Sequence, residues 1–125
     1  MNLNQVTISS VNLEKAVAFY TLLGLKLIVD ALPRYARFEC PDGEATFSIH
    51  FNENKQQHNN TIVYFEDENL EALVFQLKQK GITFISELEH KSWLWTEAHL
   101  LDPDGNKIIL FKAAKNRKNP PCRIN

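Results

Sequence analysis

An internal repeat constrains the fold of this chain more than any other feature. Asn12-Leu13-Glu14 recurs as Asn69-Leu70-Glu71, and the same spacing relates Gly24 to Gly81. A later turn, Pro41-Asp42-Gly43, recurs as Pro103-Asp104-Gly105, with additional residues before it in the second half. Two copies of one unit indicate a duplicated module rather than a solenoid, which needs at least three repeats.

Each half has the same predicted order of secondary structure. Alternating apolar residues predict a first strand at residues 5–9 and again at 62–65. A helix follows in each half, with Asn12 and Asn69 as expected N-caps and Gly24 and Gly81 as the left-handed residues that end it. Three strands then follow each helix, at 26–31, 35–39 and 45–51 in the first half and at 83–87, 93–101 and 107–111 in the second.

This order predicts an α+β fold of two tandem βαβββ modules. We expect a single domain over residues 1–112, made of modules 1–58 and 59–112, followed by a basic tail at 113–125. From Lys112 to Arg123 the chain carries five basic residues and no acidic one. We interpret this stretch as a solvated tail, with an anion site or a partner site as the alternative. Whether the tail folds back, packs on a partner subunit or stays disordered is open at this point.

Length and composition exclude several classes of protein. A chain of 125 residues corresponds to one domain. A net charge of −1 argues against nucleic acid as a partner. No apolar run is long enough to span a membrane, and the N-terminus lacks the features of a secretory signal. Cys40 and Cys122 have neither a disulfide nor a zinc spacing, which is typical of reduced thiols in a cytoplasmic protein.

The repeat and its motifs resemble those of the vicinal oxygen chelate superfamily, which includes glyoxalase I, bleomycin and fosfomycin resistance proteins, and extradiol dioxygenases. The resemblance covers residues 3 to 112. It implies that each module curls its sheet, that the paired sheets form a cup-shaped curved mixed sheet, and that the chain is a homodimer. The residues that carry it run from Val11 to Tyr20, from Leu23 to Leu25, from Leu70 to Leu73, from Lys80 to Ile82, and from Leu101 to Asn106.

In metal-dependent members of that superfamily, four strand positions hold one divalent metal. The resemblance places them at Gln5, Ser48, Ile62 and Ile109. Isoleucine cannot bind a metal, neutral serine is a poor ligand, and Gln5 alone does not make a site. We therefore predict no metal cofactor. The alternative is a divalent metal bound by Gln5 and His50 as relocated ligands, with Glu97 or His99 completing the set.

Strand alternation predicts which side chains line the cup. Val6, Ile8, Phe47, Ile49, Phe51, Val63 and Phe65 are expected to face the helices. Aromatic walls with a few polar groups suit a small, partly planar ligand. For Trp93 and Trp95, a ligand wall and a core or dimer interface are equally open. The predicted ligand-binding residues are Gln5, Thr7, Ser48, His50, Tyr64, Trp95, Ile109 and Phe111.

Other polar residues receive weaker assignments. Tyr35 and Arg37 share one strand face, which we expect to be a solvated outer face; contact with an anionic ligand is the alternative. Glu97 is a general base only if the cup surrounds it. His58, in the polar linker between the modules, and His90, in a loop, are assigned no role. No catalytic residue is predicted.

Three functional hypotheses follow. The leading one is a glyoxalase- or bleomycin-resistance-like protein that binds a small organic molecule without the usual catalytic metal. The second is a metal-dependent lyase, isomerase or dioxygenase of the glyoxalase type that uses Gln5 and His50. The third is a non-catalytic assembly module. In none of them is the partner nucleic acid or a membrane.

Overall fold

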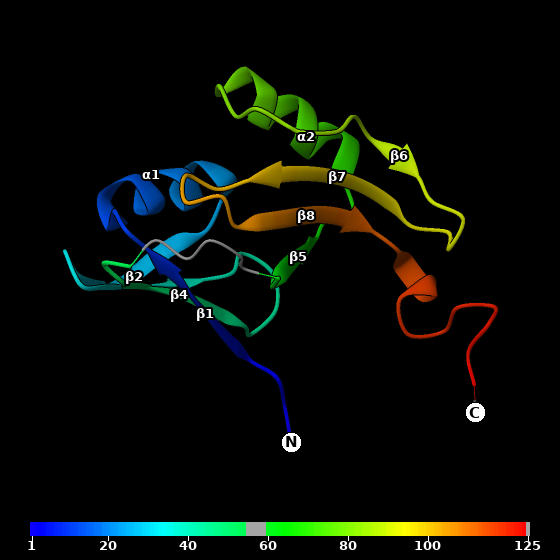
Figure 1. Cartoon of the computed structure of the whole chain (residues 1–125). Helices are drawn as coiled ribbons and strands as arrows, with labels where there is room; N and C mark the ends of the chain where they lie inside the picture. Colours follow the sequence, from blue (N-terminus) through cyan, green and yellow to red (C-terminus); the bar gives the residue numbers. More distant parts are fainter. Residues whose placement is uncertain (55–59, 125) are drawn as a thin grey trace. The chain divides into compact units, whose positions relative to one another are not determined.

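The computed structural model describes residues 1–54 and 60–124, which form two modules of the same kind (Figure 1). The chain forms two compact units. The first unit holds Met1–Asn59 with Asp102–Asp104, and the second holds Asn60–Leu101 with Gly105–Asn125. The elements of the first are β1 (Gln5–Ser10), α1 (Leu13–Leu23), β2 (Lys26–Ala31), β3 (Tyr35–Glu39) and β4 (Thr46–Phe51). Those of the second are β5 (Ile62–Glu66), α2 (Leu70–Gln79), β6 (Glu89–His90), β7 (Thr96–Leu101), β8 (Lys107–Lys112) and the 3₁₀ helix η1 (Ala114–Asn116).

The two sheets have one topology. In the first sheet the strand order is β1-β4-β3-β2, and in the second it is β5-β8-β7-β6. The opening strand of each unit pairs in parallel with the last strand of that unit, and the other pairs are antiparallel. The predicted α+β fold of two tandem βαβββ modules is therefore confirmed.

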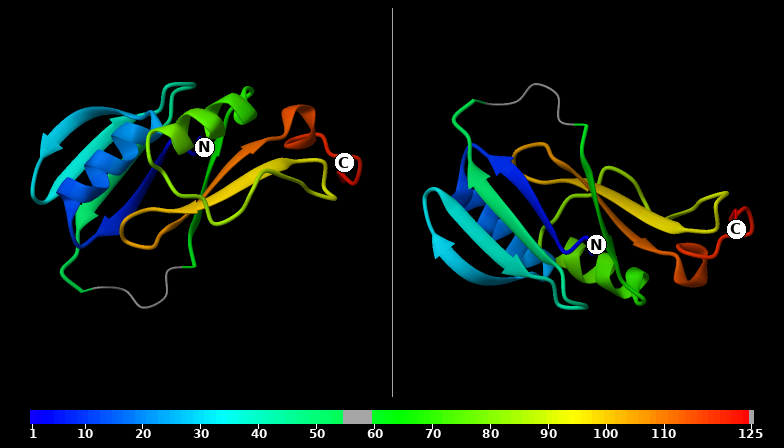
Figure 2. Two further views of the ribbon diagram at one scale, coloured as in Figure 1. Left: turned by 90° about the horizontal axis from the view of Figure 1, so that it is seen from above. Right: turned by 90° about the horizontal axis from the view of Figure 1, so that it is seen from below.

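The core of the first unit forms where α1 covers one face of its sheet (Figure 2). The ring of Tyr20 lies 4.7 Å from that of Phe47 and 6.1 Å from that of Phe38, measured between centroids. Asn12 begins the helix as expected, because its side chain accepts a hydrogen bond from the Lys15 amide. Gly24 ends it with φ of 116°, a left-handed conformation that glycine adopts without steric cost.

The second unit repeats this arrangement, with one difference at the start of its helix. The buried residues of α2 are Leu70, Val74 and Leu77, and the helix contacts β8 of its sheet. Asn69 occupies the N-cap position as predicted, but its side chain makes no capping hydrogen bond. Instead, the Asn69 amide donates to the Asp67 carboxylate at 2.7 Å, so an aspartate two residues earlier organises this turn.

Two predicted strands of the second half differ from the observed ones. Residues 83–87 form only an isolated bridge, between Phe84 and Leu100, and the paired strand is the two-residue β6. The predicted strand 93–101 begins only at Thr96. Its first residues form a turn in which the Leu94 amide donates to the Lys91 carbonyl while Leu94 has φ of 69°. A residue with this φ cannot continue a strand.

The start of the predicted tail packs on the second unit. The Asn116 carbonyl accepts a hydrogen bond from the Trp95 indole at 3.2 Å, and Arg117 forms an ion pair with Glu66 at 3.4 Å. The predicted module boundary at 58/59 and His58 lie outside the described residues. Within residues 1–54 and 60–124, no helix is both long and apolar enough to cross a membrane. The cytoplasmic location and the homodimer stay predictions.

Candidate functional site

The first sheet presents a row of polar side chains on the face that is turned away from α1, which we call the polar face. Thr7 pairs with Ser48, and Ser48 pairs with Arg37, so these residues lie side by side across β1, β4 and β3. Their neighbours in sequence lie on the opposite face: Phe47, which precedes Ser48, and Phe38, which follows Arg37, both contact Tyr20 of α1. The polar face comprises Gln5, Thr7, Ser9, Tyr35, Arg37, Glu39, Thr46, Ser48 and His50.

Hydrogen bonds join the residues of the polar face across β1 and β4. The hydroxyls of Thr7 and Ser48 lie 2.5 Å apart, and Ser48 is fully buried. At one end the Thr46 hydroxyl donates to Gln5 at 2.8 Å, and at the other end Ser9 lies 3.1 Å from Nε2 of His50. The four predicted site residues of the first half, Gln5, Thr7, Ser48 and His50, thus share one face.

Tyr35 and Arg37 belong to the same face as the predicted ligand-binding residues of the first half. That this face is solvated, or that it contacts an anionic ligand, stays a prediction. Nε of Arg37 donates to the Tyr35 hydroxyl at 2.8 Å, and the guanidinium carbon lies 5.5 Å from the centre of the tyrosine ring. A hydrogen bond from Ser48, together with Arg37, holds the pKa of Tyr35 below its usual value. The spacing showed that the two side chains share a face, but only the pairing of Arg37 with Ser48 identifies which face.

The second sheet carries three aromatic rings in contact, Tyr64, Trp95 and Phe111, which we call the aromatic cluster. Trp95 stacks on Phe111 with 4.5 Å between ring centroids, and Tyr64 meets both rings edge-on. Ile109 pairs with Tyr64 and is buried beside Phe111. Tyr64 is 47% exposed, so the cluster is open at one side. The four predicted site residues of the second half, Tyr64, Trp95, Ile109 and Phe111, therefore also lie together, on their own unit.

A buried carboxylate lies beside the aromatic cluster. Glu97 pairs with Phe111 in the sheet and is only 4% exposed. Its two oxygens have different partners, because the Trp93 indole donates to Oε2 at 2.8 Å and Nε2 of His99 lies 2.8 Å from Oε1. Sequence reasoning named Glu97 and His99 singly and missed the pair, although their spacing of two residues on one strand places them on the same face.

The residues present do not fit a metal of the glyoxalase type. Of the four ligand positions that the resemblance names, Ile62 and Ile109 offer only hydrocarbon, and the hydroxyl of Ser48 is engaged by Thr7. Gln5 and His50 are offset by four residues along the paired strands, roughly 13 Å, and they hydrogen-bond to Thr46 and Ser9, respectively. Among the described residues, no group of three His, Cys, Asp or Glu side chains is arranged to hold an ion.

A shallow groove of about 560 Å³ lies elsewhere in the second unit, at the start of α2. His90, Leu94, Thr96, Lys112 and Asn116 are among the residues that line it. None of the eight predicted ligand-binding residues borders this groove, so it is distinct from both the polar face and the aromatic cluster.

Sequence comparison decides the family. The profile described as Glyoxalase/Bleomycin resistance protein/Dioxygenase superfamily matches residues 2–110. The chain belongs to this superfamily. The resemblance to this superfamily, which the repeat predicted, is therefore confirmed. A search of curated protein sequences finds no match to the chain.

Solved structures of this superfamily share the fold of the chain at low sequence identity. A glyoxalase/bleomycin resistance protein/dioxygenase from Nocardioides aligns with a TM-score of 0.79 and 19% identity, over 100% of this chain and 90% of its own. Lactoylglutathione lyase from Agrobacterium tumefaciens aligns with 0.74 and 14%, over 89% and 92%. A bleomycin-binding protein complexed with bleomycin aligns with 0.72 and 19%, over 90% and 98%. At these identities the likeness establishes the fold alone.

Proposed function

We propose that this protein binds a small, partly planar organic molecule, without a catalytic metal, and that the aromatic cluster supplies the stacking surface. The observation that carries the proposal is the stacked pair of Trp95 and Phe111 with the half-exposed Tyr64 against it. Offset or edge-on stacking on such rings contributes binding energy beyond the burial of apolar area. Ile62 and Ile109 stand at two expected metal positions and favour an apolar contact there instead.

The superfamily supports a binding function of this kind. One structural relative is a bleomycin-binding protein complexed with bleomycin. Another is a bleomycin resistance determinant encoded on the transposon Tn5. Bleomycin is therefore the first ligand to test, followed by small aromatic and antibiotic-like compounds.

The two tryptophans make a direct binding assay available. Trp93→Phe leaves Trp95 as the single tryptophan, so its fluorescence reports on the aromatic cluster. We expect a saturable change in Trp95 emission on titration with a ligand, and a rise in melting temperature, because a ligand that binds only the folded state stabilises it. The proposal fails if no compound produces a saturable change.

A matched variant locates the binding. Phe75 is 63% exposed on α2 and is not one of the rings in contact in the aromatic cluster. Phe75→Leu should leave the affinity unchanged, whereas Phe111→Leu should weaken it about 10-fold, the equivalent of about 1.4 kcal/mol of lost stacking. Equal affinities of the two variants would place the ligand elsewhere.

A second candidate is an enzyme that transfers protons, and the Glu97–His99 pair favours it. A carboxylate that accepts a hydrogen bond from one imidazole nitrogen orients the ring and leaves the other nitrogen, here Nδ1, to accept a proton. Glu97 also accepts from Trp93, which holds the carboxylate in place. If this candidate is correct, His99→Gln removes turnover of a substrate found by screening while its binding at Trp95 persists. Unchanged turnover would exclude His99 as the base.

The metal-dependent alternative has its own test. The tag-free protein is exposed to nickel, zinc, manganese and iron, and its metal content is measured by mass spectrometry. The proposed metal-free function expects no stoichiometric ion. About one ion per chain in the wild type, lost in His50→Ala, would instead support a lyase, isomerase or dioxygenase that uses His50 and Gln5.

A further inference from the structure

Arg37 lies among hydroxyl groups and has no acidic partner. It is half-buried on β3, beside Ser48 of β4, and none of the ion pairs of the described residues includes it. Charged side chains that lose part of their water are usually paired with an opposite charge. The nearest acid on its own strand, Glu39, is engaged by Lys26 at the far end of β3.

The Arg37 side chain is held in one orientation. Nε donates to the Tyr35 hydroxyl at 2.8 Å, while the guanidinium lies over the ring of the same tyrosine. Of the five N–H donors of the guanidinium, this bond uses one. The remaining four have no acceptor among the residues that the structure describes. The edge formed by the two terminal amino groups is the one that binds carboxylate or phosphate oxygens in pairs.

The surroundings of Arg37 add hydroxyl groups, and the carboxylate of the polar face, Glu39, is paired with Lys26 at 3.7 Å. Thr7 and Ser48 contribute hydroxyls in direct contact with each other, and Ser48 also hydrogen-bonds Tyr35. His50 pairs with Tyr35 at the other side. The pKa of Tyr35 lies below its usual value because of Ser48 and Arg37, so these groups already stabilise negative charge on an oxygen at this place.

We propose that Arg37, with Tyr35 as its positioning residue and the hydroxyls of Ser48 and Thr7 beside it, binds an oxyanion group of a small organic ligand, a carboxylate or a phosphonate. The inference rests on the proposed small-molecule function and names a chemical class for the ligand. The anionic group binds to the fork of Arg37, and no metal takes part. A neutral analogue of the same shape binds more weakly.

The test uses three probes that differ only in one group: benzoate, phenylphosphonate and the neutral benzamide. Binding to the full-length protein is followed by the ¹H–¹⁵N NMR signals of the Arg37, Ser48 and Thr7 amides. We expect saturable shifts with the two anions and weaker shifts with benzamide. Absence of saturable shifts at these amides with either anion in the wild-type protein would overturn the inference, whatever the variants do.

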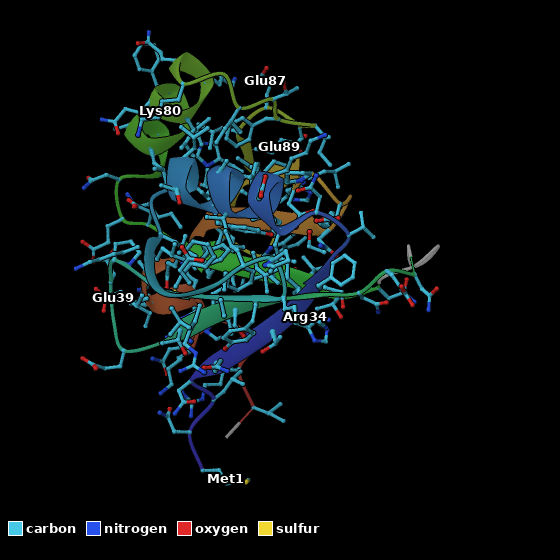
Figure 3. All side chains as sticks on the ribbon, turned by 90° about the vertical axis from the view of Figure 1, so that its left-hand side faces the viewer. Met1, Arg34, Glu39, Lys80, Glu87 and Glu89 are labelled. Atoms are coloured by element: carbon cyan, nitrogen blue, oxygen red, sulfur yellow. The ribbon has the colours of Figure 1, made fainter. Side chains whose placement is uncertain are left out.

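Arg34 provides the matched control, since it is an exposed arginine next to β3. Figure 3 shows Arg34 and Glu39 at the two ends of this strand. Arg37→Gln should weaken anion binding about 10- to 100-fold, the range for lost hydrogen bonds to a charged group, whereas Arg34→Gln should have no effect. Arg37→Lys, which keeps the charge and loses the fork, should fall between. Equal affinity of Arg37→Gln and wild type would overturn the inference.

The two proposals fail in different ways. Binding of neutral aromatic ligands detected at Trp95, without any anion effect at Arg37, would leave the proposed function intact and overturn the oxyanion site. Binding of benzoate and phenylphosphonate that depends on Arg37, without any ligand response of Trp95, would support the oxyanion site and count against the aromatic cluster as the stacking surface.

Discussion

The hydroxyl of Tyr20 donates a hydrogen bond of 2.6 Å to Oδ2 of Asp102, a residue 82 positions later in the chain. Tyr20 is fully buried in α1, and Asp102 is 5% exposed. Both residues belong to segments that carry the family resemblance. Tyr20 ends the segment that starts at Val11, and Asp102 begins the Asp-Pro-Asp-Gly turn of the segment from Leu101 to Asn106. The segment Asp102–Asp104 belongs to the first unit, where Asp104 also accepts from the Val11 amide at 2.9 Å.

This buried bond predicts the effect of Tyr20→Phe. The substitution keeps the ring against Phe47 and removes one donor from a buried carboxylate, which should lower the free energy of unfolding by about 1–3 kcal/mol. Urea denaturation measures the change. Tyr64→Phe, at a half-exposed tyrosine, is the matched control and should change stability by less than about 0.5 kcal/mol. Equal effects of the two substitutions would contradict the prediction.

The same tyrosine predicts how stability depends on alkaline pH. Burial raises the pKa of Tyr20 well above its usual value of 10.0, and the Asp102 carboxylate raises it further. Above about pH 10 the unfolded chain therefore releases a proton that the folded chain keeps, and stability falls as pH rises. The contribution is fully present below pH 10. Wild type should lose stability more steeply than Tyr20→Phe above pH 10, by up to about 1.4 kcal/mol per pH unit. Parallel pH profiles would refute this assignment.

The two thiols should differ in reactivity. Burial raises the pKa of Cys40, which is partly buried, whereas Cys122 is exposed. Because the thiolate is the reactive form, a thiol reagent such as DTNB at neutral pH should modify one cysteine quickly and the other slowly. Cys122→Ser should abolish the fast phase, and Cys40→Ser should leave it. A fast phase that disappears in Cys40→Ser would show the opposite order.

Leu94 predicts a stabilising substitution. Its φ of 69° costs a residue with a Cβ atom roughly 1–2 kcal/mol, and its side chain is 55% exposed. Leu94→Gly should raise the free energy of unfolding by about 0.5–1 kcal/mol, because relief of the strain exceeds the entropy that glycine adds to the unfolded chain. Leu101→Gly, at an exposed leucine that pairs with Lys107 at the end of β7, should instead destabilise. A loss of stability in both variants would contradict the role assigned to Leu94.

The sequence predicted the fold through periodicity, and its errors have local causes. The bounds of β2 and β3 match the prediction. The inward placement of Phe47 and Ile49 follows from alternation, because Thr46, Ser48 and His50 stand between and beside them. The strand expected at 83–87 does not form, because this segment contacts β7 only through the isolated bridge of Phe84 with Leu100 and the hydrogen bond from the Ile85 amide to the His99 carbonyl. Alternation identifies a strand and cannot reveal whether a partner strand is within reach.

The candidate site was harder to predict than the fold. The eight predicted ligand-binding residues were placed by strand parity and by the metal positions that the resemblance implies. Neither related Arg37 to Ser48, since a lone strand does not reveal which of its faces meets the helix. The register of Arg37 with Ser48 identifies that face. The pairing of Glu97 with His99 and Trp93 depends on side-chain geometry, which no spacing rule contains. The assignment of all these residues to ligand binding stays a prediction until a ligand is measured.

The parallel pairing of β1 with β4 has a consequence for how the chain folds. Gln5 pairs with Thr46 and Ser10 pairs with Phe51, so each residue of the first strand pairs with a residue 41 positions later in the chain. Closing a loop of that length costs entropy before any of the ladder hydrogen bonds form. On the ribosome, where synthesis proceeds from the N-terminus, β1 can pair with β4 only after β4 has emerged. In the second unit, β5 likewise can pair with β8 only after β8 has emerged.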